Sequence, residues 1–316
     1  MSQRGAPHRP GGVQELSEAR LLTEYQLARG RLVAIAHGIL GDLGEAEDVV
    51  QEAWLRLRRT AATDAIESVT GWLVVTTSRL ALDAVGSARR RRETYVGPWL
   101  PEPIVTFDPV GAPPPGDPAD RVTLVEAVST AVLVVLETLT PAERTAFVLH
   151  DVFGMPFGEV ADIVGRTPSA VRQLAARARR HVREGAPRFD ADPQRHREVV
   201  AAFTAAMEDG DVHGLLHLLD PDVVLHSDGG GRVRAARKPV HGADRVARFL
   251  AGIQRKRSYR PWPARINAGP GVVLSRDGRP VAAVSLTVVD GRVARVDMVI
   301  NPDKLARTGA PWKDNP

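Results

Sequence analysis

The chain has 316 residues, more than one typical domain, so its length predicts two or three domains that each bury a core. No apolar run approaches the length of a membrane span, and the N-terminal residues lack the order of a signal peptide. We therefore expect a cytoplasmic protein that does not bind membranes. The absence of cysteine excludes disulfides and thiolate zinc sites and fits a reducing compartment. The formal net charge of +4 is modest, so clusters of basic residues are more informative than the total.

The first segment, residues 14–92, has helical periodicity almost throughout and predicts a compact helical domain. One of its helices has an apolar stripe on one side and, on the other, Asp48, Gln51 and Glu52. Asp48 and Glu52 are four residues apart, where like charges weaken an isolated helix by about 0.2–0.5 kcal/mol. A basic partner would relieve this repulsion, although the same pattern is also typical of a solvated helix face.

A later helix of this domain opens near Gly71 and ends in the run Arg89, Arg90, Arg91 and Arg92. Such a run marks either a solvated helix end or a phosphate contact, and positive charge is favourable at a helix C-terminus. An arginine-rich helix further along the chain, described below, favours the phosphate contact.

The next segment, residues 93–119, contains eight prolines. Proline removes a backbone donor and fixes φ, so neither a helix nor a sheet is expected to run through it. The sequence predicts an extended linker here.

Residues 120–186 predict a second helical domain, with a capping box at residues 140–143 before its central helix. Apolar residues at i, i+3, i+4 and i+7 from Phe157 then give a short amphipathic helix, which Gly165 ends. Thr167 followed by Pro168 starts another helix with a similar apolar face. Two helices joined in this way are typical of a DNA-binding helix-turn-helix.

The free face of the second helix is rich in arginine and contains no acid. Arginine forms bidentate bonds to guanine and phosphate, and glutamine does so to adenine, which suits a recognition helix in the major groove. A two-helix hairpin with a solvated basic face is the alternative, and the acid-free composition argues against it. The candidate DNA-contacting residues are Ser169, Arg172, Gln173, Ala176, Arg177, Arg179 and Arg180.

After Asp190 the pattern changes, and residues 191–306 predict a separate α+β domain. Helical periodicity continues to about Leu219, and alternating stretches then predict strands over residues 222–228, 279–289 and 292–300. Asp290-Gly291 predicts a tight hairpin turn between the last two strands.

Three groups of residues together resemble an extracytoplasmic-function (ECF) sigma factor. They are Asp48-Val49-Val50-Gln51-Glu52-Ala53-Trp54, then Gly71-Trp72-Leu73 with the arginine run, and then Leu139-Thr140-Pro141-Ala142-Glu143-Arg144 with the helix-turn-helix. The match spans residues 16–184 in the order of sigma regions 2 and 4.

Three further motifs resemble the sigma-factor subgroup with a fused SnoaL-like domain. They are Tyr95-Val96-Gly97-Pro98-Trp99-Leu100-Pro101-Glu102-Pro103, Asp228-Gly229-Gly230-Gly231 and Asn301-Pro302-Asp303-Lys304-Leu305. The resemblance implies a multidomain fold: two all-α sigma domains, followed by an α+β cone-shaped SnoaL-like (NTF2-like) domain whose curved sheet wraps around helices.

The resemblance also implies partners, namely core RNA polymerase, through its β′ clamp helices and β flap, and promoter DNA. Asp48, Gln51 and Glu52 match the region that binds the β′ clamp helices, and the recognition-helix residues match the part that reads the −35 element. A loop of region 2 would hold a flipped base of the −10 element, which needs a pocket and polar contacts. The −10 candidates are Asp64, Glu67, Ser68, Thr76, Thr77, Arg79 and the run Arg89 to Arg92.

The C-terminal domain is expected to regulate the sigma factor in cis, because tethering gives it a high effective concentration. Its alternating strands place His226 and Asp228 on one strand face and Arg295 and Asp297 on another, so all four could line a pocket for an unknown small ligand. Catalysis is not expected, and neither a metal nor a cofactor is implied. The candidate regulatory contacts are Trp99, Leu100, Pro101, Asn301, Pro302, Asp303, Lys304 and Leu305.

Two alternatives from other classes remain at this stage. A polyketide-cyclase-like enzyme with regulatory helical domains would turn over a hydrophobic substrate and depend on Asp297 or His226. A helix-turn-helix repressor would bind a palindromic operator as a symmetric dimer without polymerase, which does not suit two unlike DNA-contacting domains.

Overall fold

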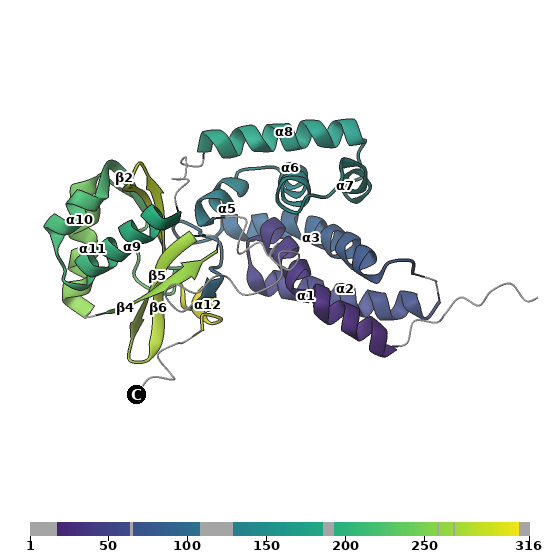
Figure 1. The fold of residues 1–316 in the computed structure, drawn as a ribbon, viewed down its shortest axis with the longest axis horizontal. Coiled ribbons are helices and arrows are strands. Elements are labelled where there is room, and N and C mark those ends of the chain that lie inside the picture. Colours follow the sequence, from purple (N-terminus) through teal and green to yellow (C-terminus); the bar gives the residue numbers. More distant parts are fainter. Residues whose placement is uncertain are drawn as a thin grey trace, which may run out of the picture.

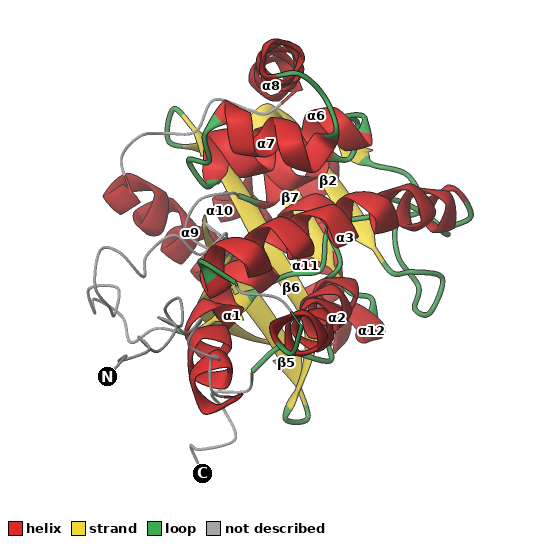
Figure 2. Cartoon of the chain, turned by 90° about the vertical axis from the view of Figure 1, so that its right-hand side faces the viewer, coloured by secondary structure: helices red, strands yellow, loops and turns green. Residues whose placement is uncertain are grey.

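A computed structural model describes residues 18–63, 66–107, 129–185, 193–257, 259–267 and 269–309. The helical part and the C-terminal domain lie side by side, with the short helix α12 (Pro302–Leu305) between them (Figure 1). Figure 2 looks onto the helical part, with strands of the sheet behind it.

The first helical unit consists of α1 (Glu18–Leu40), α2 (Leu43–Ala61) and α3 (Val69–Glu93). Asp42 is the N-cap of α2, where its side chain accepts a hydrogen bond from the Glu45 N–H. The apolar stripe predicted for α2 is buried at Val50, Ala53 and Leu57. This face packs on α1 and α3, so the acidic side of α2 is left outside.

The second helical unit comprises α5 (Thr130–Leu136), α6 (Pro141–Ala146) with its π-helical continuation η1 (Phe147–Val152), α7 (Phe157–Val164) and α8 (Pro168–Gly185). The predicted capping box is present, since Thr140 and Glu143 each bond the other's backbone N–H. Gly165 ends α7 in the left-handed conformation at φ 68°, and Thr167 accepts from the Ala170 N–H at the start of α8. These contacts confirm the predicted helix-turn-helix.

The two helical units share one continuous hydrophobic core. Buried residues of α1, α2 and α3 and those of α5 to α8 belong to the same cluster, which runs from Leu21 to Ala178. In this form of the protein the two sigma-like units are therefore packed together and not held apart by the linker.

The C-terminal domain combines α9 (Pro193–Glu208), α10 (Val212–Leu218) and α11 (Ala243–Arg257) with a curved sheet. The strand order is β1-β4-β5-β6-β7-β2-β3, and all neighbours are antiparallel except β2 and β7. Its strands are β2 (Leu219–Asp228), β3 (Val240–His241), β4 (Arg260–Ile266), β5 (Gly269–Arg276), β6 (Arg279–Val289) and β7 (Arg292–Val299), with β1 (Val105–Thr106) from the linker. The helices cover one sheet face and the helical part meets the other.

The fold class predicted for this domain is confirmed, as are three of its strands. The hairpin between β6 and β7 turns at Asp290 and Gly291, both with positive φ (51° and 74°). Strands β3, β4 and β5 and helix α11 were not predicted. The prediction that no sheet runs through the linker was wrong, because Val105 and Thr106 pair with Ile266 and Arg265 at the free edge of β4.

Replacement of glycine by alanine should have opposite effects on stability at two positions of this domain. A Cβ on Gly271 in β5 would lie 2.6 Å from the Val284 carbonyl oxygen, whereas a Cβ on Gly252 in α11 would meet nothing within 4 Å. Gly271→Ala should destabilise the chain by about 1–3 kcal/mol through overpacking. Gly252→Ala should stabilise it by about 0.5–1 kcal/mol by lowering the entropy of the unfolded chain. Urea unfolding followed by circular dichroism checks both, and similar midpoints for the two variants would contradict the packing described.

Candidate nucleic-acid interface

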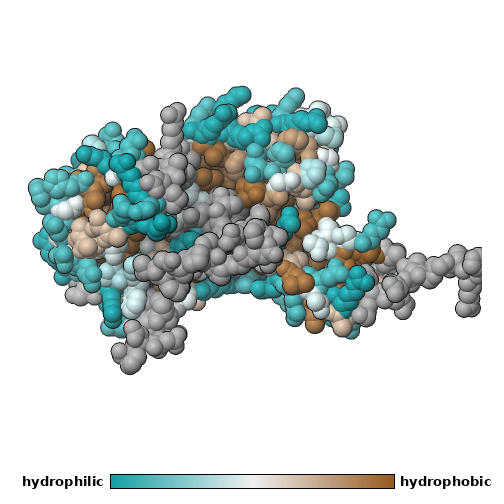
Figure 3. Space-filling view, in the orientation of Figure 1, coloured by the Kyte–Doolittle hydropathy of each residue, from teal (hydrophilic) through white to brown (hydrophobic). Residues whose placement is uncertain are grey.

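The outer face of α8 is the most basic surface of the helix-turn-helix. Val171, Ala175 and Ala178 are buried against the underlying helices, which leaves the candidate side chains outside. Figure 3 shows hydrophilic residues along this face and hydrophobic ones beneath it. Ser169, Arg172, Gln173, Ala176, Arg177 and Arg180 are exposed, and Arg179 is half-exposed.

Two of the arginines are held by acids of the same unit. Arg177 pairs with Glu143 at 2.7 Å, and Arg179 pairs with Asp151 at 2.7 Å. Burial alone would raise the pKa of Glu143, but hydrogen bonds from Arg177 and Thr140 bring it below its usual value. Arg172 lies over the Phe157 ring at 5.4 Å. These contacts orient the guanidinium groups on a rigid helix, which favours bidentate recognition.

The predicted −10 residues do not form one exposed surface. Glu67 and Ser68 are exposed, and the Ser68 hydroxyl accepts from the Gly71 N–H at the start of α3. Thr77 is fully buried, so its predicted DNA contact is wrong for this conformation. Helical periodicity places it beside Ser78 on the core side of α3. Asp64 and the side chains of Arg89, Arg90, Arg91 and Arg92 lie outside the described residues.

Thr76 and Arg79 line a shallow cavity of about 240 Å³ together with Arg56, Arg59 and Trp72. The combination of arginines with an aromatic ring is suited to a stacked base and its phosphate. Arg56 and Arg59 were not predicted as site residues. They lie on α2 and Trp72 lies on α3, so only the packing of the two helices shows that they share a cavity.

The acidic face of α2 already has basic neighbours on its own helix. Asp48 and Gln51 are exposed, whereas Glu52 lies 2.7 Å from Arg56 and 3.5 Å from Arg59. The Arg56 hydrogen bond holds the pKa of Glu52 below its usual value. Part of the repulsion predicted from the sequence is thus relieved within the helix.

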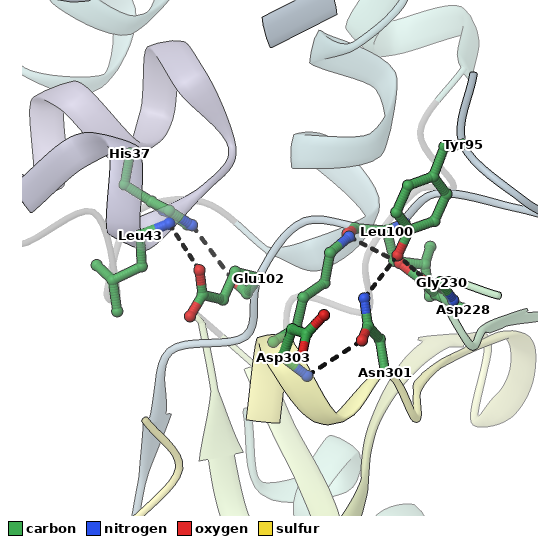
Figure 4. Close-up of polar contacts among 10 residues, drawn as sticks. His37, Leu43, Tyr95, Leu100, Glu102, Asp228, Gly230, Asn301 and Asp303 are labelled. Carbon is green, nitrogen blue, oxygen red and sulfur yellow. Dashed lines mark hydrogen bonds and ion pairs between the residues drawn. The ribbon is translucent and has the colours of Figure 1, made fainter. Parts of the chain in front are cut away.

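The linker meets the C-terminal domain at the carboxylate of Asp228, which is fully buried. Its Oδ1 accepts from the Tyr95 hydroxyl at 2.6 Å and the Gly230 N–H at 3.1 Å. Its Oδ2 accepts from the Leu100 N–H at 2.9 Å and from Lys304 Nζ at 2.8 Å (Figure 4). Burial and the bond to Asp228 raise the pKa of Tyr95. We call this cluster the linker latch.

Most of the candidate regulatory residues converge on the linker latch. Asn301 Nδ2 donates to the Tyr95 oxygen at 2.9 Å, and Lys304 Nζ lies 4.2 Å from the centre of the Trp99 ring. Leu100, Pro101 and Leu305 are buried beside them. Asp303 instead points outward to the exposed Arg232, and Pro302 lines a cavity on the other side of α12.

Glu102 continues the linker contacts into the first helical unit. Its Oε2 accepts from the Leu43 N–H at 2.9 Å, its N–H donates to the Gly41 carbonyl at 3.1 Å, and its Oε1 lies 3.1 Å from Arg307 Nη1. Burial raises the pKa of Glu102, and the Leu43 and Arg307 bonds oppose this. Arg307 also reaches Glu47 on α2 at 3.4 Å. Glu102 lies within the linker motif Trp99 to Pro103 that the sequence suggested as a contact region, whereas no contact was predicted for Arg307.

Four residues predicted to line a pocket lie on the wrong face of the sheet. His226, Asp228, Arg295 and Asp297 point toward the helical part, whereas the cavity is on the helix-covered face, next to Ser227 and Met298. His226 lies 3.3 Å and Arg295 2.7 Å from Asp297. Burial alone would raise the pKa of Asp297, but these two neighbours bring it below its usual value. Alternation along a strand shows which side chains share a sheet face, but it does not show which of the two faces encloses the cavity.

Direct contacts join the two helical units near the candidate DNA surfaces. Arg79 of α3 donates to the Asp162 carbonyl of α7 at 3.0 Å. Arg144 of α6 is buried, where its Nε donates to the Gly38 carbonyl of α1 at 2.9 Å and its Nη1 pairs with Glu137. Burial lowers the pKa of Arg144 to about 9.

None of the described helices is long and apolar enough to cross a membrane. Within the same described residues, no group of three or more His, Cys, Asp or Glu side chains could hold a metal ion.

Two protein-family profiles match the helical part: Sigma-70 region 2 over residues 25–91 and Sigma-70, region 4 over residues 129–182. The helix-turn-helix, the acidic helix and these matches define a transcription factor of the sigma-70 class. The ECF RNA polymerase sigma factor SigJ of Mycobacterium tuberculosis is 40% identical over 309 residues, 93% of this chain and 95% of SigJ. The chain belongs to the family of ECF RNA polymerase sigma factors.

Two further comparisons extend this result to the C-terminal domain. SigI of the same species, described as a probable ECF RNA polymerase sigma factor, is 39% identical over 292 residues, 89% of this chain and 93% of SigI. The crystal structure of SigJ superposes with a TM-score of 0.71 at 36% identity and covers 92% of this chain and 99% of that chain. The last domain has the curved sheet and covering helices of the SnoaL-like (NTF2-like) fold.

Arg172→Ala should weaken binding of the holoenzyme to a promoter by about 1–3 kcal/mol if the side chain bonds a base edge. The loss should be confined to promoters with the matching −35 base pair, and it is measured by titrating holoenzyme onto matched and single-base-changed fragments. Arg197→Ala on α9, which is also exposed, serves as the control. A uniform loss across all fragments would assign Arg172 to phosphate contact instead.

Proposed function

We propose that this protein directs core RNA polymerase to promoters by reading the −35 element with α8 and the −10 element with the α2–α3 region, and that its C-terminal domain controls this activity in cis. The exposed basic face of α8 supports the reading of the promoter. The contact between the two helical units supports the control, because the units cannot reach both promoter elements at once while it is closed. The polymerase contacts would be the β′ clamp helices at Asp48, Gln51 and Glu52, and the β flap. Such a protein works in the cytoplasm, where the polymerase acts.

The distance between promoter elements requires the protein to open. Elements near −10 and −35 are about 25 base pairs apart, roughly 85 Å along B-DNA at about 3.4 Å per base pair. In the closed structure Arg79 of one unit touches Asp162 of the other. Both units can read their elements only after this contact and the buried Arg144 contact have separated. Core polymerase is the scaffold that would stabilise the open form.

The C-terminal domain holds both helical units in the closed form. Through Asp228 and Lys304 it binds the linker, whose Glu102 in turn binds the first unit. It also binds the second unit directly, because Thr130 at the start of α5 bonds Asn267 at 2.8 Å and Ser285 at 2.9 Å. A domain that contacts both units and the linker between them sets how readily they separate, which is the basis of the proposed regulation.

A binding role for the C-terminal domain is favoured over catalysis. Among the described residues, the side chains that line its cavity include neither a carboxylate nor an imidazole. General acid–base chemistry most often uses one of these groups, although a tyrosine such as Tyr259, which lines the cavity, can also transfer a proton. The His226 and Asp297 cluster lies on the opposite sheet face and so does not supply one.

Run-off transcription tests the assignment as a sigma factor. Core polymerase with this protein should give specific new transcripts from genomic promoter fragments, and core polymerase alone should not. The absence of transcripts from every fragment would favour the enzyme or repressor alternatives.

Opening can be measured by energy transfer, because the chain contains no cysteine. A Cβ on Gly86 of α3 or on Gly158 of α7 would meet nothing within 4 Å, so Gly86→Cys with Gly158→Cys gives two exposed labelling sites. Transfer between the dyes should be high in the free protein and fall when core polymerase is added. Equal transfer in the free and bound forms would show that no opening occurs.

Asp228→Asn should loosen the linker latch, since it leaves the ammonium of Lys304 buried without its carboxylate. We expect lower energy transfer in the free protein and a changed yield of run-off transcript. Asp277→Asn is the matched control, because Asp277 is exposed and its positive φ (51°) suits asparagine. Unchanged transfer and unchanged yield in Asp228→Asn would remove the proposed regulation.

A further inference from the structure

The C-terminal domain contains a cavity of about 700 Å³ between α11 and the concave face of the sheet. This volume lies in the range of small-molecule sites. Its walls are largely apolar, with Phe249, Ile253, Leu274 and Met298 among the lining side chains. An apolar molecule of ordinary metabolite size would therefore be desolvated in it.

The charged side chains that line this cavity among the described residues are all positive. Arg234, Arg248 and Arg276 line it, and the described lining residues include no acid. Arg248 pairs with Asp244 at 2.9 Å on the outer side of α11, and Arg276 lies 3.6 Å from Asp277, so both have weak, exposed partners that a ligand can replace. Arg234 is exposed in the loop after β2. Guanidinium groups at an apolar cavity favour a carboxylate.

A buried hydroxyl gives an independent indication of a ligand. Ser227 is 1% exposed and lines the cavity, yet its Oγ has no hydrogen-bond partner among the described residues. Leaving a buried hydroxyl unpaired costs about 1–3 kcal/mol. A polar atom of a bound molecule would satisfy it.

The cavity adjoins the linker latch. Ser227 immediately precedes Asp228, and Pro302 and Leu305 of α12 line the cavity on one side while Lys304 between them bonds Asp228. A second cavity of about 550 Å³ shares Ser227 and Arg234 with the first, and Val96 and Gly97 of the linker form part of its wall. A molecule in the cavity therefore contacts the elements that hold the linker.

We propose that the C-terminal domain binds an apolar molecule with a carboxylate group, with the apolar body between α11 and the sheet and the carboxylate at Arg234, and that occupancy changes the hold of Asp228 and Lys304 on the linker. The proposal of a binding site depends only on the cavity and its lining residues. The proposed effect of the bound molecule on transcription depends also on the cis regulation proposed above.

Laurate is a suitable probe, with dodecanol as its neutral counterpart, both titrated into the full-length protein below their aggregation concentrations. We expect saturable laurate binding at one site and at least tenfold weaker binding of dodecanol. Gly252→Trp should weaken laurate at least tenfold, because position 252 lines the cavity and has open space for a side chain. Gly30→Trp, at a similarly open helical glycine in α1, should bind as the unchanged protein does. Arg234→Gln should reduce the preference for laurate over dodecanol.

Absence of saturable laurate binding, or equal binding by Gly252→Trp, would overturn the site. Equal binding of laurate and dodecanol would overturn the carboxylate assignment. Run-off transcription with and without laurate tests the coupling, and we expect a change in yield with the unchanged protein but not with Gly252→Trp. Laurate that binds without changing the yield would overturn the coupling alone. The cis regulation itself is tested separately, by energy transfer and transcript yield of Asp228→Asn without any ligand.

Discussion

The buried carboxylate of Asp228 is the constraint on which the arrangement of the domains depends. A carboxylate removed from water costs several kcal/mol unless it is paired and hydrogen-bonded. Here two of its four donors, Tyr95 and the Leu100 N–H, come from the linker and not from the domain that contains Asp228. The C-terminal domain therefore completes its own core by binding the segment that connects the sigma domains. In this respect the linker is part of the fold of the last domain as much as a connection between the first two.

The same principle applies at the other boundaries between the domains. Arg144 and Glu102 are buried where units meet, and each bonds backbone groups of the first helical unit. Buried ion pairs contribute little net stability compared with apolar packing, but removing one partner is costly, so they favour one arrangement over others. Boundaries of this kind hold a definite closed form and can still separate, because each group recovers its hydration once exposed. This suits the separation of the two helical units on core polymerase that we propose.

The helix-turn-helix was predictable from the sequence because its signals are local: apolar spacing, Gly165 at a left-handed position and a cap at Thr167. The structure of the linker was harder to predict, because its prolines exclude long regular elements but do not show that Val105 pairs with β4. The candidate pocket residues failed for a related reason. His226 and Asp297 share a sheet face, but only the packing of α9 to α11 decides which face encloses the cavity. Thr77 was misplaced because its role was carried over from the family resemblance, whereas its position on α3 buries the side chain completely.

The hydrophobic core shared by both helical units has a thermodynamic consequence for assembly with polymerase. Separation of α3 from α6 and α7 hydrates apolar side chains that are dry in the free protein, and hydrating apolar surface raises the heat capacity. Burial of sigma surface on the polymerase lowers it. The two contributions have opposite signs, so the net heat-capacity change on assembly is less negative than the contact area alone implies. An interface area calculated from the measured heat-capacity change, without a contribution from the separation of the helical units, would therefore be smaller than the true area of contact with polymerase.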